Sequence, residues 1–159
     1  MRAMTTSQRL FETRVDTAWV DYNGHMNDAE YARVFSLAVD ELMVQIGLDD
    51  AGRERESYTL FTLETHLCYR REAHQGEALA VDIELLDRDA KRLHGFFSLY
   101  NADGELLATS EQMLMGIDTS SGRPAPFPAA VSHQLDGFAV IDGAAWPEAA
   151  GRRIGIVRR

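Results

Sequence analysis

One long run of helical periodicity, set among segments that alternate like strands, most constrains the fold of this chain. From residue 28 to residue 46 apolar side chains recur every three or four positions, so one helix face carries Tyr31, Phe35, Ala38, Val39, Leu42, Met43 and Ile46. Asn27, with Glu30 three residues later, resembles a capping box at the helix start, and Gly47 is suited to the helix end. A helix with one apolar face must bury it against a second layer.

Strand-like segments flank this helix and predict that second layer. Residues 11–20 predict a first strand, and four more follow a polar linker at 49–57. These four strands are expected to form a meander, at residues 58–69, 79–85, 93–100 and 105–117. The order predicts an α+β fold in which an antiparallel sheet wraps a long central helix.

The alternation within the strands predicts which side chains face the core. In residues 79–85 the odd positions are apolar, a clear period of two. In residues 58–69 the odd positions Phe61, Leu63, Leu67 and Tyr69 are largely apolar, which places Glu64 and His66 on the opposite face. We predict one domain at residues 1–136, with a short helix at 129–135, and a loosely ordered tail at 137–159.

Composition excludes several classes of protein. The net charge of -9 disfavours nucleic-acid binding, because a phosphate backbone would be repelled. A single cysteine allows no intramolecular disulfide and favours a reducing, cytoplasmic location. We also expect neither a signal peptide nor a membrane span, since no apolar run approaches the roughly 18 residues that a span requires.

The segment between the first strand and the helix carries the motif that points to a family. WVDYNGHMNDAEYARVF resembles the strand-loop-helix signature of the 4-hydroxybenzoyl-CoA thioesterase type of hotdog protein. The segments YTLFTLETH, DAKRLH, LLATSEQMLM and GRPAPFP are similar to the betainyl-CoA thioesterases of carnitine catabolism. The resemblance implies a single hotdog domain that hydrolyses a short acyl-CoA, betainyl-CoA in particular, with Asp21 as nucleophile or general base.

Elementary chemistry gives Asp21 the same role. A thioester carbonyl under attack develops negative charge, which the free amides at a helix N-terminus can stabilise. The backbone N–H of Asp28, with that of Asn27 as a second candidate, is the predicted oxyanion donor, and Asp21 would stand across the bound acyl group. The alternative is that Asp21 only shapes the loop through an Asx-turn. His25 could position substrate or the loop, and Asn27 is best explained as the helix cap.

Glu64 and His66 share one face of a predicted strand, so they could share a proton or a ligand. Because hotdog active sites lie between subunits, the resemblance implies that this pair could serve a partner's Asp21 in a homodimer or homotetramer. The alternative is a polar pair with no catalytic duty.

Two further groups are assigned to substrate. A quaternary ammonium needs aromatic faces, for which the candidates are Trp19, Tyr22, Tyr58 and Phe61, unless these are core residues. Arg88, Lys91 and Arg92 cluster at one turn, and in the resembling family a basic segment there contacts the nucleotide end of CoA. An ordinary charged hairpin tip is the alternative.

Other functions are less well supported. An enoyl-CoA hydratase would need an Asp/His couple, for which Asp21 and His25 are too close in sequence, and an acyl-CoA sensor or a thioesterase of other acyl specificity remain alternatives. We expect no metal site among His25, His66, His74 and His94, because no pair has compact ligand spacing. No cofactor is expected beyond the CoA of the substrate.

Overall fold

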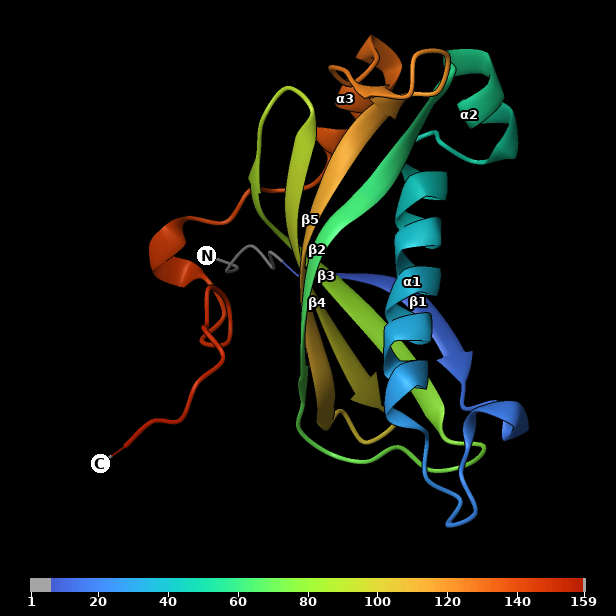
Figure 1. The fold of residues 1–159 in the computed structure, drawn as a ribbon, viewed down its shortest axis with the longest axis vertical. Helices are drawn as coiled ribbons and strands as arrows, with labels where there is room; N and C mark the ends of the chain where they lie inside the picture. Colours follow the sequence, from blue (N-terminus) through green and yellow to red (C-terminus); the bar gives the residue numbers. More distant parts are fainter. Residues whose placement is uncertain (1–6, 159) are drawn as a thin grey trace, which may run out of the picture.

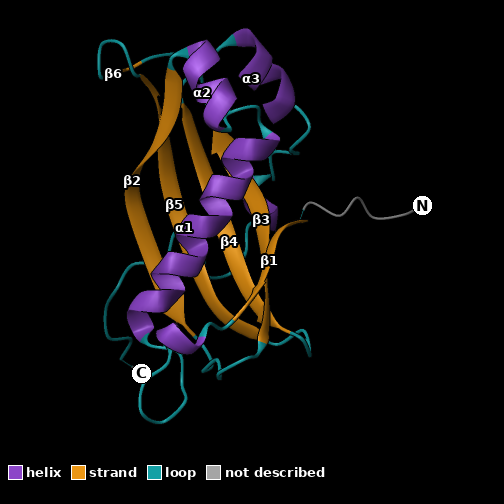
Figure 2. Ribbon diagram, turned by 90° about the vertical axis from the view of Figure 1, so that its right-hand side faces the viewer, coloured by secondary structure: helices purple, strands orange, loops and turns teal. Residues whose placement is uncertain are grey.

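The chain folds as a curled antiparallel sheet with one long helix lying across its face. The computed structural model describes residues 7–158, and in it α1 (Asp28–Gln45) crosses the sheet (Figures 1 and 2). All the apolar positions on the predicted face of α1 are buried, and Val34 joins them. The α+β prediction of a helix wrapped by a sheet is therefore confirmed.

Six strands form this sheet within the described residues: β1 (Gln8–Arg14), β2 (Tyr58–Tyr69), β3 (Ala78–Arg88), β4 (Arg92–Asn101), β5 (Leu106–Asp118) and β6 (Arg123–Pro124). Their order is β1-β3-β4-β5-β2, with β6 paired to β5. The predicted four-stranded meander was wrong, because only β3 to β5 form one. β1 occupies the free side of β3, and β2 pairs with β5 at the opposite edge.

The helix ends follow from local hydrogen bonds. The Asn27 side chain accepts from the Ala29 amide at 3.0 Å, as a cap should, but Glu30 pairs with Arg33 and does not complete a capping box. Gly47 follows the helix with φ of +86°, a conformation that other residues adopt only with strain. The start and the end of α1 are thus set by the two residues that the sequence indicated.

Two expectations about connecting segments were wrong for the same reason, an aspartate acting as a cap. The first strand stops at Arg14, because Asp16 accepts from the Ala18 amide at 2.8 Å and starts a 3-10 helix over Thr17–Trp19. The polar linker contains the short helix α2 (Asp50–Glu56), capped by Asp49. No helix in residues 7–158 is both long and apolar enough to cross a membrane.

A bulge in β2 changes which side chains face the core. Tyr58 and Leu60 are buried, whereas Phe61 and Leu63, predicted to face inward, are each 54% exposed. The bulge between Thr62 and Glu64 inserts one residue and reverses the alternation. Beyond it the odd positions point toward α1 as predicted: Leu67 packs on the core, and the Tyr69 hydroxyl donates to the Asp28 carbonyl oxygen at 3.0 Å.

The C-terminal residues contact the face of the sheet that α1 leaves uncovered (Figure 1). After α3 (Ala129–Leu135), which the sequence predicted, Ile141 is buried with Leu86 and Phe96. The Trp146 indole N–H donates to the Ile141 carbonyl at 3.1 Å, and the Gly151 amide donates to Glu111 at 2.7 Å. The side chains of residues 152–158 are exposed. The expected tail therefore consists of a packed part and an exposed part.

Close packing at Gly116 yields a stability prediction. A Cβ atom there would lie 1.6 Å from the Tyr58 hydroxyl oxygen, which is held by a 2.7 Å hydrogen bond to the Ala125 carbonyl. We expect Gly116→Ala to lower the free energy of unfolding by about 1–3 kcal/mol, the usual cost of overpacking. Gly143→Ala is the matched control, because nothing lies within 4 Å of its added Cβ. Equal midpoints for the two variants in urea denaturation would contradict this account.

Candidate active site

Asp21 is fixed by the loop that joins the 3-10 helix to α1. Its Oδ1 accepts from the amides of Asn23 at 2.8 Å and His25 at 3.2 Å, and its own amide donates to the His25 carbonyl at 2.9 Å. Asp21 is therefore an Asx-turn residue, which was the structural alternative to a catalytic role in the sequence analysis. Its Oδ2 has no hydrogen-bond partner within residues 7–158, so a loop-shaping role leaves one oxygen available for chemistry.

The two candidate oxyanion donors differ. The Asn27 amide donates to the Trp19 carbonyl at 2.8 Å and is therefore occupied, which removes it as a donor. The Asp28 amide is the first of α1, and none of the residues that the structure describes accepts a hydrogen bond from it. A first-turn amide of this kind also carries the positive end of the helix dipole. The Asp28 amide is thus the better candidate for the oxyanion donor.

Asp21 and Asp28 line one hollow of about 420 Å³. Its walls come from the loop at 21–27, the first turn of α1, the end of β2 and residues 70–72. The Arg71 guanidinium on this wall is paired with Glu105 at 3.1 Å. A carboxylate, a helix start and a cavity large enough for a small acyl group therefore meet at one end of the molecule.

Two tyrosines line this hollow that sequence reasoning did not assign to the site. Tyr31 and Tyr69 meet edge to face with ring centroids 5.1 Å apart, and the Tyr31 hydroxyl accepts from the Ala73 amide at 3.0 Å. Burial raises the pKa of both phenols, so they stay neutral at physiological pH. Their positions in the sequence indicated only an apolar helix face and an apolar strand face, which are equally typical of core residues.

The four aromatic residues proposed from the sequence do not form one wall in a single chain. Trp19 is half-buried and packs on the core, and Tyr22 is 96% exposed. Tyr58 is 2% exposed, and this burial raises its pKa to about 12. Phe61 lies exposed on the sheet edge. Tyr58 is thus a core residue, as the alternative expected, and offers no face to a ligand.

Glu64 and His66 lie on the face of the sheet away from α1. They pair in register with Met113 and Glu111, and Glu111 contacts the C-terminal segment on that outer face. The His66 ring stands 3.6 Å from the Cys68 sulfur. Within one chain, therefore, the structure does not bring Glu64 or His66 to the hollow that contains Asp21.

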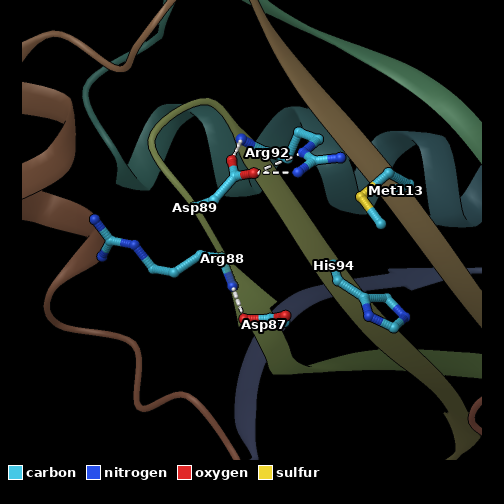
Figure 3. Close-up of a pocket in the computed structure, with 6 residues that line it drawn as sticks. All are labelled: Asp87, Arg88, Asp89, Arg92, His94 and Met113. Carbon is cyan, nitrogen blue, oxygen red and sulfur yellow. Dashed lines mark hydrogen bonds and ion pairs between the residues drawn. The ribbon is translucent and has the colours of Figure 1, made fainter.

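The basic turn between β3 and β4 is shown in Figure 3 and borders a second hollow, of about 180 Å³. The Arg88 guanidinium donates to Ser132 of α3 at 3.1 Å and to Asp136, directly after that helix, at 3.0 Å. Arg92 donates to Asp89 at 2.7 Å, and this hydrogen bond is the main reason that the pKa of Asp89 is lowered to about 2. Lys91 is exposed and, within residues 7–158, forms no ion pair. Lys91 is therefore the most available cation of the three.

The basic turn and the Asp21 hollow lie at opposite ends of the molecule. In Figure 1 the β3–β4 turn is near α3, whereas the loop before α1 is at the other end of that helix. β2 runs the whole way between them, and its 12 residues span about 36 Å at 3.3 Å per residue. One chain therefore separates the two predicted parts of the substrate site.

A thioesterase is the class of protein that this fold and site define. The family model of the thioesterase-like superfamily matches residues 15–135. The chain belongs to this family, and the predicted hotdog thioesterase is confirmed. A Staphylococcus aureus protein solved in complex with CoA superposes with a TM-score of 0.86 at 36% identity, over 99% of this chain and 100% of that one.

Among named relatives, the similarity extends to particular thioesterases. Over 92% of this chain and 93% of its own length, the betainyl-CoA thioesterase of Pseudomonas aeruginosa is 44% identical. The L-carnitine dehydrogenase/betainyl-CoA thioesterase of Rhizobium meliloti is 40% identical over 92% of this chain, which covers only 30% of that longer protein.

Proposed function

We propose that this enzyme hydrolyses betainyl-CoA to glycine betaine and CoA, as a step of carnitine catabolism. The observation that carries the proposal is the position of Asp21 on the same hollow as the first amide of α1, with one carboxylate oxygen that no residue from 7 to 158 engages. The P. aeruginosa relative supports the acyl group. The single cysteine favours work in the cytoplasm.

In the proposed reaction the Asp28 amide stabilises the thioester oxygen as it becomes negative. The Asp21 carboxylate either takes a proton from water as the water oxygen attacks the carbonyl carbon, or attacks that carbon itself. In both cases the C–S bond breaks, and the sulfur leaves as thiolate and is then protonated. In the second case water hydrolyses the resulting anhydride. The rigid loop supports either route, because a positioned carboxylate loses little freedom when substrate binds.

The cationic end of betaine fits the composition of the hollow. Tyr69 is half exposed and presents its ring, with the buried Tyr31 packed edge to face against it. The carboxylates of Asp21, Asp28 and Glu72 on this hollow outnumber the guanidiniums of Arg70 and Arg71. An ammonium group on an aromatic face gains roughly 0.5 to 2 kcal/mol. We therefore assign the cationic end of the acyl group to the ring of Tyr69, in place of the buried Tyr58.

A homodimer formed through β2 would complete the site. Among the described residues no strand pairs with the outer edge of β2, which carries the exposed Phe61 and Leu63, and these features favour pairing with another strand. If two copies pair antiparallel about a twofold axis, the Tyr58 end of one β2 lies beside the Tyr69 end of the other. That arrangement brings the basic turn of one subunit toward the acyl hollow of its partner, where Lys91 and Arg92 could contact CoA phosphates. Glu64 could reach the chemistry only in such an assembly.

The hydratase alternative lacks a necessary contact. Asp21 accepts from the backbone of His25, whereas the His25 imidazole pairs with Glu72 at 3.1 Å. The Asp/His couple that a hydratase would use is therefore absent from these two residues. A thioesterase of another acyl specificity differs from our proposal only in the cation, and an assay on matched substrates distinguishes them.

The first prediction concerns Asp21. Asp21→Asn keeps the oxygen that accepts from the loop amides but removes the basic, nucleophilic carboxylate, so we expect kcat to fall by roughly 10² to 10⁴ with little change in melting temperature. Steady-state release of CoA measures the effect. Glu64→Gln is assayed beside it, and a loss of similar size would make Glu64 part of the reaction. An Asp21→Asn enzyme that keeps more than about a third of kcat would contradict the assignment.

The second prediction concerns the cation. We expect kcat/KM for betainyl-CoA to exceed that for its neutral isostere, in which a tert-butyl group replaces trimethylammonium, by at least about tenfold. Tyr69→Leu should lower this ratio, because the aliphatic side chain has no aromatic face. Equal rates on the two substrates in the wild type would remove the betaine assignment and leave the thioesterase assignment intact.

The third prediction concerns assembly. We expect light scattering to give at least twice the 17.8 kDa of one chain. Phe61→Lys places a charge on the β2 edge and should yield inactive monomer. Val44→Lys is the control, since Val44 is also about half exposed but lies on α1. An active monomer of the wild type would argue decisively against a shared site.

A further inference from the structure

We propose that His25, Glu72 and His74 form a binding site for a divalent transition-metal ion of the Zn²⁺ type at the edge of the acyl hollow, and that the bound ion opposes the cationic substrate. The second half of the proposal rests on the proposed function. The first half rests only on the arrangement of these three side chains.

The three side chains already stand close to ligand geometry. Their candidate ligand atoms all lie within 4.8 Å of one another. His25 Nδ1 and Glu72 Oε2 are 3.1 Å apart, near the separation of about 3.3 Å that two ligands of a tetrahedral zinc ion adopt at Zn–N distances of 2.0–2.1 Å. The His25 and His74 rings are 4.9 Å apart.

The backbone beneath this cluster is held on both sides. His25 and His74 face each other in an antiparallel bridge between the loop at 21–27 and the segment that follows β2. The Met26 amide donates to the Ala73 carbonyl at 2.8 Å, and the Gln75 amide donates to the Gly24 carbonyl at 3.0 Å. These two hydrogen bonds form the bridge and fix the two histidine backbones relative to each other, so little backbone ordering is required when an ion binds.

The donor set selects the class of ion. Two imidazoles and one carboxylate suit Zn²⁺, Co²⁺ or Ni²⁺, whereas Mg²⁺ and Ca²⁺ prefer oxygen ligands alone. Glu72 and His74 are exposed, which leaves room for water as a fourth ligand. Glu77, 3.9 Å from His74 Nδ1, adds a carboxylate that can orient that ring. No metal site was expected from the sequence, because no pair of histidines has compact ligand spacing, whereas here the fold brings His25 and His74 together.

A bound ion would act on the reaction through charge and through Glu72. His25 and Glu72 line the hollow, and the His25 amide donates to Asp21. A dication held there repels a quaternary ammonium and withdraws the Glu72 carboxylate from it. We therefore expect Zn²⁺ to raise KM for betainyl-CoA several-fold more than KM for the neutral isostere.

The test measures binding and inhibition separately on tag-free enzyme. Calorimetric titration with ZnCl2 should give one site per chain, and visible absorption of bound Co²⁺ should report nitrogen ligation. We expect His74→Ala, which removes a ligand outside the acyl hollow, to weaken Zn²⁺ at least tenfold. His133→Ala is the matched control, an exposed histidine on α3 at the other end of the molecule.

The outcomes separate this site from the proposed function. Equal Zn²⁺ affinity in the wild type and His74→Ala would overturn the metal site, whatever the substrate. If His74→Ala loses Zn²⁺ binding but Zn²⁺ inhibits wild-type hydrolysis of betainyl-CoA and of the neutral isostere equally, the charge effect would be overturned. Failure of the enzyme to hydrolyse betainyl-CoA would contradict the proposed function but leave the calorimetric and spectroscopic result intact.

Discussion

The rest of this structure depends on the burial of one face of α1 against the curled sheet. Phe35, Leu42 and Ile46 are almost wholly buried there, and each side chain of this size contributes roughly 1.5–3 kcal/mol. That packing fixes the helix axis and therefore the position of its first amides. Tyr69 binds the carbonyl of Asp28, and Tyr31 binds the backbone after β2, so hydrogen bonds tie the helix start to the sheet at the site. The candidate site thus lies at the start of a helix whose apolar face is well buried.

Asp21 shows why a structural role and a chemical role need not be alternatives. A carboxylate has two oxygens, and the Asx-turn uses one of them. The turn holds the side chain in one orientation, which is what a general base or nucleophile requires. The sequence indicated both roles as alternatives, but it could not show that each role uses a different carboxylate oxygen. Asn27 differs, because its side chain caps α1 and its amide donates to the Trp19 carbonyl, so both groups have structural roles.

The sequence predicted those features that depend on periodicity and failed at those that depend on pairing. The helix face, the bounds of β2 and the short helix α3 followed from local patterns. The strand order did not, because alternation is the same for any neighbour and nothing local assigns β2 to β5. The bulge at Thr62 was also missed, and it reversed the predicted faces of Phe61 and Leu63. The tyrosines of the hollow were missed because contacts between distant segments define them.

The side chains of the hollow, in which three carboxylates outnumber two guanidiniums, also explain how one site could accept two kinds of cation. A trimethylammonium group has no N–H to donate and cannot act as a metal ligand, so it gains most from a ring face such as that of Tyr69. A transition-metal ion gains most from imidazole nitrogen, which His25 and His74 supply at the edge of the hollow. Glu72 both lines the hollow and is one of the three candidate metal ligands, so it can serve either cation. Competition for this single carboxylate, together with repulsion between the cations, would couple metal binding to choice of acyl group without any change of fold.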